Sequence, residues 1–293
     1  AEGTTSIAGN QAGGDGGGVT VTGATGTVNL AASSVRVTGN TASNGAGIYA
    51  MSGTVVVAPG ATVAENEASS TGGGIWAQGG DVLMDGTLRA NTAGGSGGGL
   101  YETNTDVTIL GGKVLANRAG QGGAGLRLSA VLGTTQSITD ATIRGNVAEQ
   151  DGGGISLEHG ALTLTGTIVE KNAARGFAGI LVSGTDVSLV MENGAIRLNR
   201  TTSQDGAGIG VLSGSATLNG VSVSGNKSVR DVGGVYVGSA SIDLVGGTTV
   251  TGNTAARHVG GVLVATRGTF PCTGISGNVP DNVVGQSGVV LCP

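Results

Sequence analysis

Asparagine recurs along this chain at nearly constant intervals. Eleven asparagines follow one another at steps of 25 to 30 residues, and most steps are close to 27. Self-similarity at a fixed period of this length indicates one structural unit stacked many times. The fold must therefore place these residues at equivalent points of successive units: Asn10, Asn40, Asn66, Asn91, Asn117, Asn146, Asn172, Asn199, Asn226, Asn253 and Asn278.

A corner of small residues and then an aliphatic residue follow each of the first ten asparagines. The step from asparagine to aliphatic residue is 8 to 10 residues, whereas the rest of the unit varies from 16 to 21. We infer that the corner is rigid and that insertions are accommodated elsewhere. The aliphatic residues are Val19, Ile48, Ile75, Leu100, Leu126, Ile155, Ile180, Ile209, Val235 and Val262.

Three short segments in each unit alternate apolar and polar residues, which is the period of a β-strand. One precedes the asparagine (SVRVTGN, 34–40), one begins at the aliphatic residue (GIWAQ, 74–78) and one follows a small turn (DVSLV, 186–190). Helical spacing is absent from the sequence. Three strands in about 27 residues describe one coil of a parallel β-helix, whose coils stack at roughly 4.8 Å.

The sequence therefore predicts an all-β fold, a single-stranded right-handed parallel β-helix of about ten coils with three strands each. Handedness rests on the right-handed rule for parallel crossovers. The coils are expected to fill residues 1–270. Residues 271–293 are expected to form a C-terminal cap of the same domain, because three of the four prolines and both cysteines lie there.

Glycine provides 61 of the 293 residues, and runs such as GGGI (72–75) have two interpretations. They could cradle a phosphate, or they could bend the chain where stacked backbones lie close. Repetition in successive units favours the corner, because a phosphate loop occurs once, between a strand and a helix.

The asparagine column has a structural interpretation of the same kind. Asparagine tolerates left-handed backbone angles, and its amide can donate to one neighbouring coil and accept from the other. We expect a buried ladder that satisfies polar groups at the corner: Asn40, Asn66, Asn91, Asn117, Asn146, Asn172, Asn199, Asn226 and Asn253.

The charge pattern limits the partners. The formal net charge is −5, and the 14 Lys and Arg residues are scattered singly along the sequence, so we expect no basic stripe and no nucleic acid partner. No apolar run approaches the roughly 18 to 20 residues that span a bilayer, and the N-terminus lacks the regions of a signal peptide. We expect no membrane span in this chain, no cofactor, and a targeting segment that has already been removed.

The coil motif resembles a known group of surface proteins. The segments TIRGNVAEQDGGGI (142–155) and TVTGNTAARHVGGV (249–262) are similar to the repeats of the chlamydial polymorphic outer membrane proteins, which carry FxxN and GGA[ILV] tetrapeptides on a β-helical passenger. They also resemble secreted right-handed β-helix repeat proteins. The resemblance implies surface adhesion or a scaffold role. β-Helices also host pectate-lyase-like and polygalacturonase-like enzymes.

Aromatic residues occupy one outward column in three consecutive coils. The residue after each aliphatic residue points outward, and at this place stand Tyr49, Trp76, Tyr101 and then Arg127. Their ring faces could form a platform for sugar rings, with Arg127 and the outward Glu158 as polar edges. Aromatic pairing that stabilises the sheet is the alternative.

A second column, four residues before each aliphatic residue, is mostly polar. Asp205 and Asp231 fall on adjacent coils, where two carboxylates could hold calcium or form a polysaccharide-cleaving pair. The alternative is a solvated turn in which Arg230 and Arg257 offset the charge.

The best catalytic patch that the repeat assembles is Arg127, Asp151, Glu158, His159 and Arg175. It matches no motif, neither histidine has metal-ligand spacing, and we name no catalytic or metal-binding residue. We therefore predict an extracellular or cell-surface structural or adhesive module that binds a glycan or a host or cell-surface partner. A polysaccharide-degrading lyase or glycoside hydrolase is the alternative function.

The two cysteines give the first testable prediction. Cys272 and Cys292 both lie in the last 22 residues, which fits a disulfide that closes a terminal loop in an oxidising compartment, with two free thiols as the alternative. A free-thiol assay on the denatured, unreduced protein should therefore detect no thiol. Detection of two thiols would contradict the disulfide.

Overall fold

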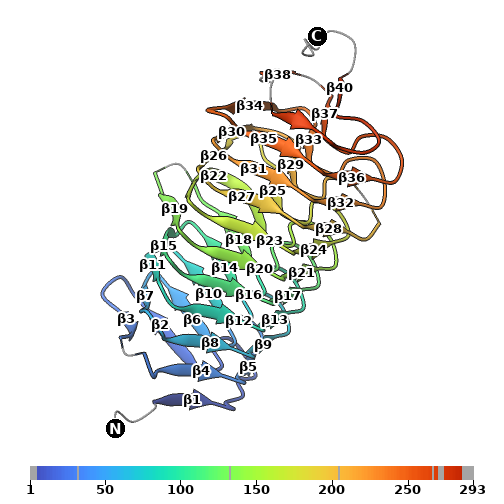
Figure 1. Ribbon diagram of the computed structural model, residues 1–293. Coiled ribbons are helices and arrows are strands. Elements are labelled where there is room, and N and C mark those ends of the chain that lie inside the picture. The colour runs from blue at the N-terminus through green and yellow to red at the C-terminus, as the bar shows by residue number, and fades with distance from the viewer. Residues whose placement is uncertain are drawn as a thin grey trace.

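The computed structural model describes residues 5–31, 33–131, 133–203, 205–265, 267–269 and 274–285. In this part of the chain every regular element is a β-strand, and the strands pair in parallel with their counterparts one coil away. The coils stack from β1 at one end of the rod to β40 at the other (Figure 1). The predicted right-handed parallel β-helix of about ten coils is confirmed.

Four strands recur around each coil, and we name the sheets that they build A, B, C and D in chain order. Sheet A, before the asparagines, contains β1 (Ser6–Ala8), β4 (Arg36–Thr38), β8 (Thr62–Ala64), β12 (Thr87–Arg89), β16 (Lys113–Leu115), β20 (Thr142–Arg144), β23 (Ile168–Glu170), β27 (Ala195–Arg197), β31 (Ser222–Ser224), β35 (Thr249–Thr251) and β39 (Ile275–Ser276). Sheet B, after the asparagines, contains β5 (Thr41–Ala42), β9 (Glu67–Ala68), β13 (Thr92–Ala93), β17 (Arg118–Ala119), β21 (Val147–Ala148), β24 (Ala173–Ala174), β28 (Arg200–Thr201), β32 (Lys227–Ser228) and β36 (Thr254–Ala255).

Sheets C and D follow the glycine corner and join through the long strand β22 (Ile155–Thr165). Sheet C also contains β2 (Val19–Thr22), β6 (Ile48–Met51), β10 (Ile75–Gln78), β14 (Leu100–Thr103), β18 (Leu126–Ser129), β25 (Ile180–Val182), β29 (Ile209–Val211), β33 (Val235–Val237), β37 (Val262–Val264) and β40 (Val283–Gly285). Sheet D also contains β3 (Thr27–Leu30), β7 (Thr54–Val57), β11 (Asp81–Met84), β15 (Asp106–Leu110), β19 (Gln136–Thr139), β26 (Val187–Glu192), β30 (Ser215–Asn219), β34 (Ser241–Val245) and β38 (Arg267–Thr269).

Sheet B adds a strand to the three expected per coil. Its strands are only two residues long, and most end in a buried alanine such as Ala93 or Ala119. Two residues are too few to show an alternating pattern, so these strands could not be found from the period of apolar and polar residues.

The glycine corner is explained by contact between coils. A Cβ on Gly74 would lie 2.6 Å from the carbonyl oxygen of Gly99, and one on Gly154 would lie 2.5 Å from that of Gly179. Both distances are well below van der Waals contact. Glycine precedes all ten aliphatic residues from Val19 to Val262, because any side chain there would push the next coil away.

The asparagine ladder is confirmed. The Oδ1 of Asn66 accepts the backbone N–H of Asn40 at 3.0 Å and its Nδ2 at 2.9 Å. The Nδ2 of Asn66 donates to Asn91 Oδ1 at 2.9 Å and to the carbonyl of Val37 at 3.0 Å. All four hydrogen-bonding positions of the buried amide are thus occupied.

Left-handed backbone angles occur one residue before the ladder, which corrects the expectation that the asparagines adopt them. Glycine fills this place in coils such as the one ending at Gly145, but five coils have another residue there. A side chain in this conformation costs roughly 1 kcal/mol or more. The five are Glu65, Ala90, Ala116, Lys171 and Leu198, with φ between 52° and 58°.

The solenoid continues past residue 270 in the described chain. Strands β39 and β40 pair with β35 and β37, and Asn278 accepts the backbone N–H of Asn253. Cys272 and Cys292 lie outside the described residues, so their disulfide stays a prediction.

The core is a set of aliphatic columns inside the coils. Ile75, Ile155 and Ile209 face the interior as predicted, each with no exposed surface, and pair with the corresponding residues of adjacent coils. Small aliphatic side chains repeated at one position stack without voids, which lets a chain with only 2% aromatic residues form a continuous core.

Ile155→Ala should lower the free energy of unfolding by about 2 to 5 kcal/mol, because the closely stacked coils cannot collapse into the space left behind. Chemical denaturation followed by circular dichroism measures this loss. Val190→Ala, at an outward valine of sheet D, is the matched control and should cost less than about 0.5 kcal/mol. Equal losses in the two variants would contradict the core assignment.

Candidate functional site

Sheet C aligns the predicted aromatic residues as one column. Tyr49, Trp76 and Tyr101 are direct partners in the parallel pairing of β6, β10 and β14, and Arg127 follows on β18. The ring centroids of Tyr49 and Trp76 are 4.4 Å apart with planes 5° from parallel, and those of Trp76 and Tyr101 are 6.5 Å apart at 3°. The column is thus one stack of parallel rings.

The expectation that the ring faces form an open platform is wrong. Parallel rings with centroids 4.4 Å apart can only lie face to face, because coplanar rings at that distance would overlap. Tyr49 is only 8% exposed, and its burial, with the nearby Asp15 carboxylate, raises the pKa of its hydroxyl. Trp76 and Tyr101 remain half-buried, so their edges reach solvent.

Arg127 and Glu158 close the end of the stack. The Arg127 guanidinium lies 4.8 Å from the centre of the Tyr101 ring, which is a cation–π contact. Its Nη2 also donates to the Glu158 carboxylate. Glu158 stands at a β-bulge, because the pairing of β18 with β22 shifts by one residue after Leu128. A bulge re-aims the side chain beside it, and alternation alone could not have revealed it.

A second aromatic pair on the same face was missed. Phe177 lies against Gly210, where an added Cβ would fall 2.0 Å from a ring carbon, and its ring is 5.7 Å from that of Tyr236. Its φ of 46° is left-handed, at a corner position where the flanking coils have Gly152 and Gly206. The signal was the segment FAGI at a place where most coils read GGG or GAG.

Glu102 is an ionisable residue inside the solenoid that the sequence analysis did not single out. It is fully buried and accepts the backbone N–H groups of Ser129 and Thr105 and the side-chain amide of Gln136. Burial raises the pKa of this carboxyl to about 7, against the opposing effect of these hydrogen bonds and of Arg127. The sequence held a signal, since an acid stands where adjacent coils have Ala77 and Leu128.

Asp205 and Asp231 lie close together as predicted, but their carboxylates take part in hydrogen bonds and ion pairs of the corner itself. Asp205 Oδ1 accepts the backbone N–H of Asp231 at 2.8 Å. The Asp231 carboxylate lies 3.5 Å from His258 Nε2 and 3.9 Å from the Arg230 guanidinium. Among the described residues, no group of three or more His, Cys, Asp or Glu is placed to hold a metal ion.

The five residues of the proposed catalytic patch occupy three separate places. Arg127 and Glu158 form the ion pair at the end of the aromatic stack. Asp151 lies at the glycine corner, where burial raises the pKa of its carboxyl and Arg175 opposes that rise. His159 lines a different cavity of about 300 Å³ together with Asp186. Among the contacts found in the described residues, none joins the Arg127–Glu158 pair, Asp151 and His159 to one another.

The basic residues do form a stripe, which corrects the interpretation of their scattered sequence positions. The coil period brings nine of the 14 Lys and Arg residues to the strands of sheets A and B and the corner between them, all exposed. The residues are Arg36, Arg89, Lys113, Arg118, Arg144, Lys171, Arg197, Arg200 and Lys227.

Sheet D has the opposite charge. Acidic residues stand on its strands or directly beside them, and in its described strands Arg267 is the sole basic residue. The protein is therefore polarised around its circumference as well as net negative. The acidic residues are Asp81, Asp85, Asp106, Asp140, Asp186, Glu192 and Asp243.

Comparison with known proteins identifies the repeat. A family model described as right handed beta helix region matches residues 17–194, which is more than half of the chain. No curated protein and no solved structure matches it. In the part of the chain that the structure describes, no helix has the length and apolar character needed to cross a membrane.

Glu102 makes stability depend on pH. Its folded pKa of about 7 lies above the ordinary 4.5, so between these values the unfolded chain ionises while the folded protein retains the proton. As pH rises through this window, the free energy of unfolding of the wild type should fall by about 3 kcal/mol relative to that of Glu102→Gln. Denaturation at pH 4.5 and pH 8 tests this.

Glu102→Leu is the matched control, because leucine fills the equivalent position, Leu128, in the next coil. Both variants lack the carboxyl and should lack its pH dependence, whatever their absolute stability. A difference from wild type that is the same at both pH values would contradict the buried protonated carboxyl.

Proposed function

Because the chain belongs to the family of right-handed β-helix regions, we propose that it is an extracellular or cell-surface structural or adhesive module that binds a saccharide along the aromatic column of sheet C. The observation that carries the proposal is the ordered series Tyr49, Trp76, Tyr101 and Arg127 on four successive coils, closed by Glu158. The series is straight and stands on a rigid sheet.

Ring edges and polar groups would contact the ligand. Tyr49 and Trp76 stack face to face, and the Tyr101 ring is parallel to that of Trp76 with its centroid 6.5 Å away, so a saccharide laid along the rod would meet the outer edges of Trp76 and Tyr101. The indole N–H, the tyrosine hydroxyl and the Arg127–Glu158 pair supply the donors and acceptors that sugar hydroxyls require. The next outward residues, Gln78 and Thr103, extend this polar border.

An extended ligand fits the repeat because sheet C presents one outward side chain about every 4.8 Å along the rod. Fixed side chains of this kind bind with little loss of conformational entropy. We propose binding rather than polysaccharide cleavage because Arg127, Asp151 and His159, the centres of the catalytic patch, stand in three separate places. The rigid rod suits a spacer or an adhesive surface.

Trp76 provides the test, because it is the sole tryptophan and its fluorescence reports on this column alone. A glycan screen identifies a binding saccharide, and titration with it should change the Trp76 emission. Trp76→Ala should weaken binding at least fivefold, about 1 kcal/mol, through loss of the indole edge and of the stacking that positions Tyr101.

Tyr236→Ala is the matched control, since it removes another outward ring of sheet C, far along the rod from Trp76. It should bind the same glycan with wild-type affinity. Circular dichroism must show both variants folded. Equal affinity of Trp76→Ala and wild type would remove saccharide binding from this column.

A further inference from the structure

We propose that copies of this chain associate side by side, with the Leu198 corner of one copy inserted into an apolar groove on sheet D of the next. The proposal concerns sheets A, B and D and is independent of the aromatic column on sheet C. It rests on the groove, on the conformation and exposure of Leu198, and on the charges around both.

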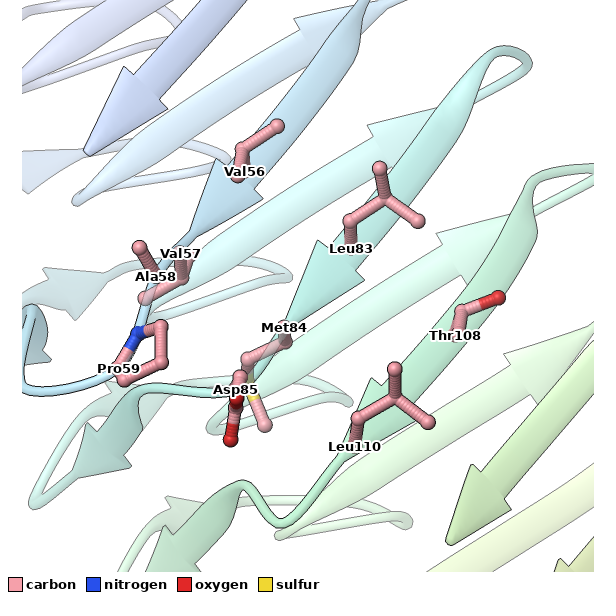
Figure 2. A pocket seen from close by; sticks show the side chains of 9 residues that line it. All are labelled: Val56, Val57, Ala58, Pro59, Leu83, Met84, Asp85, Thr108 and Leu110. Carbon is pink, nitrogen blue, oxygen red and sulfur yellow. The ribbon is translucent and has the colours of Figure 1, made fainter. Parts of the chain in front are cut away.

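The groove lies on the outer face of sheet D, across β7, β11 and β15. Val56, Leu83 and Leu110 point outward there from successive strands, with Pro59 at one end (Figure 2). Leu83 is 44% exposed and Leu110 53%. The hollow measures about 190 Å³. Cavities of about 150 Å³ can hold benzene, so there is room for a leucine side chain.

Leu198 destabilises the fold through its backbone conformation and its exposed apolar side chain. It has a left-handed φ of 57° at the A–B corner, where the next coil has Gly225, and its side chain lies across that glycine while remaining 49% exposed. A branched aliphatic residue in this conformation is strained, and exposure gives it no compensating burial. Strain of this kind points to a contact outside the coil.

The charges around the two surfaces are complementary. Lys171, Arg197 and Arg200 surround Leu198, and all three are exposed. Arg197 shares the buried carboxylate of Glu170 with Arg144, whereas no ion pair to Lys171 or Arg200 is found in the described chain. Such free cations would be attracted to an acidic surface.

Acidic residues border the groove. Asp85 lines it, and Asp81 and Asp106 stand outward on β11 and β15, two residues before Leu83 and Thr108. We call Leu198 and its corner the knob. Basic residues at the knob and acidic residues at the groove favour a second copy of the chain as the occupant of the groove, because one chain supplies both surfaces. Both surfaces also repeat at the same coil spacing, so parallel rods can bring several charges into register.

The contact is heterologous, because Leu198 and the groove lie on different sheets and on different coils. Each copy keeps one free knob or one free groove after pairing. Such contacts extend into rows unless a rotation closes them into a ring.

Sedimentation velocity on the full chain tests the proposal. At ~50 mM NaCl the wild type should sediment faster as its concentration rises from about 1 to 100 µM, and less so at ~500 mM, where the flanking charges are screened. Leu198→Gly, which relieves the left-handed strain, and Leu83→Thr, which copies Thr108 of the next coil, should each weaken association at least tenfold.

The two variants together provide the sharpest test. Leu198→Gly retains the groove and Leu83→Thr retains the knob, so an equimolar mixture should form dimers that cannot extend, at concentrations where each variant alone is monomeric. Val245→Thr, at another exposed valine of sheet D, is the control and should associate like wild type. A monomeric wild type, association unchanged in the variants, or a mixture without dimers would each overturn the proposal.

Discussion

The close approach of successive coils at the glycine corner is the constraint on which the rest of the structure depends. The backbone of Gly74 lies so near the carbonyl of Gly99 that no side chain fits between them, and the Asn91 amide occupies the remaining space. That amide must then use every donor and acceptor it has, because water cannot reach it. Glycine permits the spacing, and asparagine satisfies the polar groups that the spacing buries.

The same spacing decides what the outer faces can display. Side chains at one outward position are held about 4.8 Å apart, a separation at which the centroids of aromatic rings can pair. Tyr49 and Trp76 therefore pack on each other rather than opening their faces to solvent. Opposite charges behave similarly, as Glu170 shows between Arg144 and Arg197. A column of residues on this fold therefore acts as one continuous surface rather than as separate sites.

The sequence was sufficient to predict the features that depend on the regular spacing of the repeats. The inward position of Ile155, the pairing of Tyr49, Trp76 and Tyr101 and the asparagine ladder all follow from counting residues between repeats. Features that depend on local geometry were not predicted. The strands of sheet B are too short to alternate, the bulge at Glu158 breaks the count, and ring orientation is set by packing. The basic stripe also follows from the period, since Arg89, Arg144 and Arg197 each stand two residues before a ladder asparagine, but it is invisible when charges are compared only along the chain.

Deviations from the repeat separate what the fold requires from what it tolerates. Inward positions accept almost any small aliphatic residue, and Glu102 is an exception whose carboxyl needs three hydrogen-bonding partners. Phe177 and Leu198 deviate differently, since each takes a left-handed conformation that glycine holds at lower cost in a neighbouring coil. Neither adds to the aliphatic core inside the coils. A side chain that departs from the repeat without adding to the core makes its contacts on the outer surface, as Phe177 does with Tyr236.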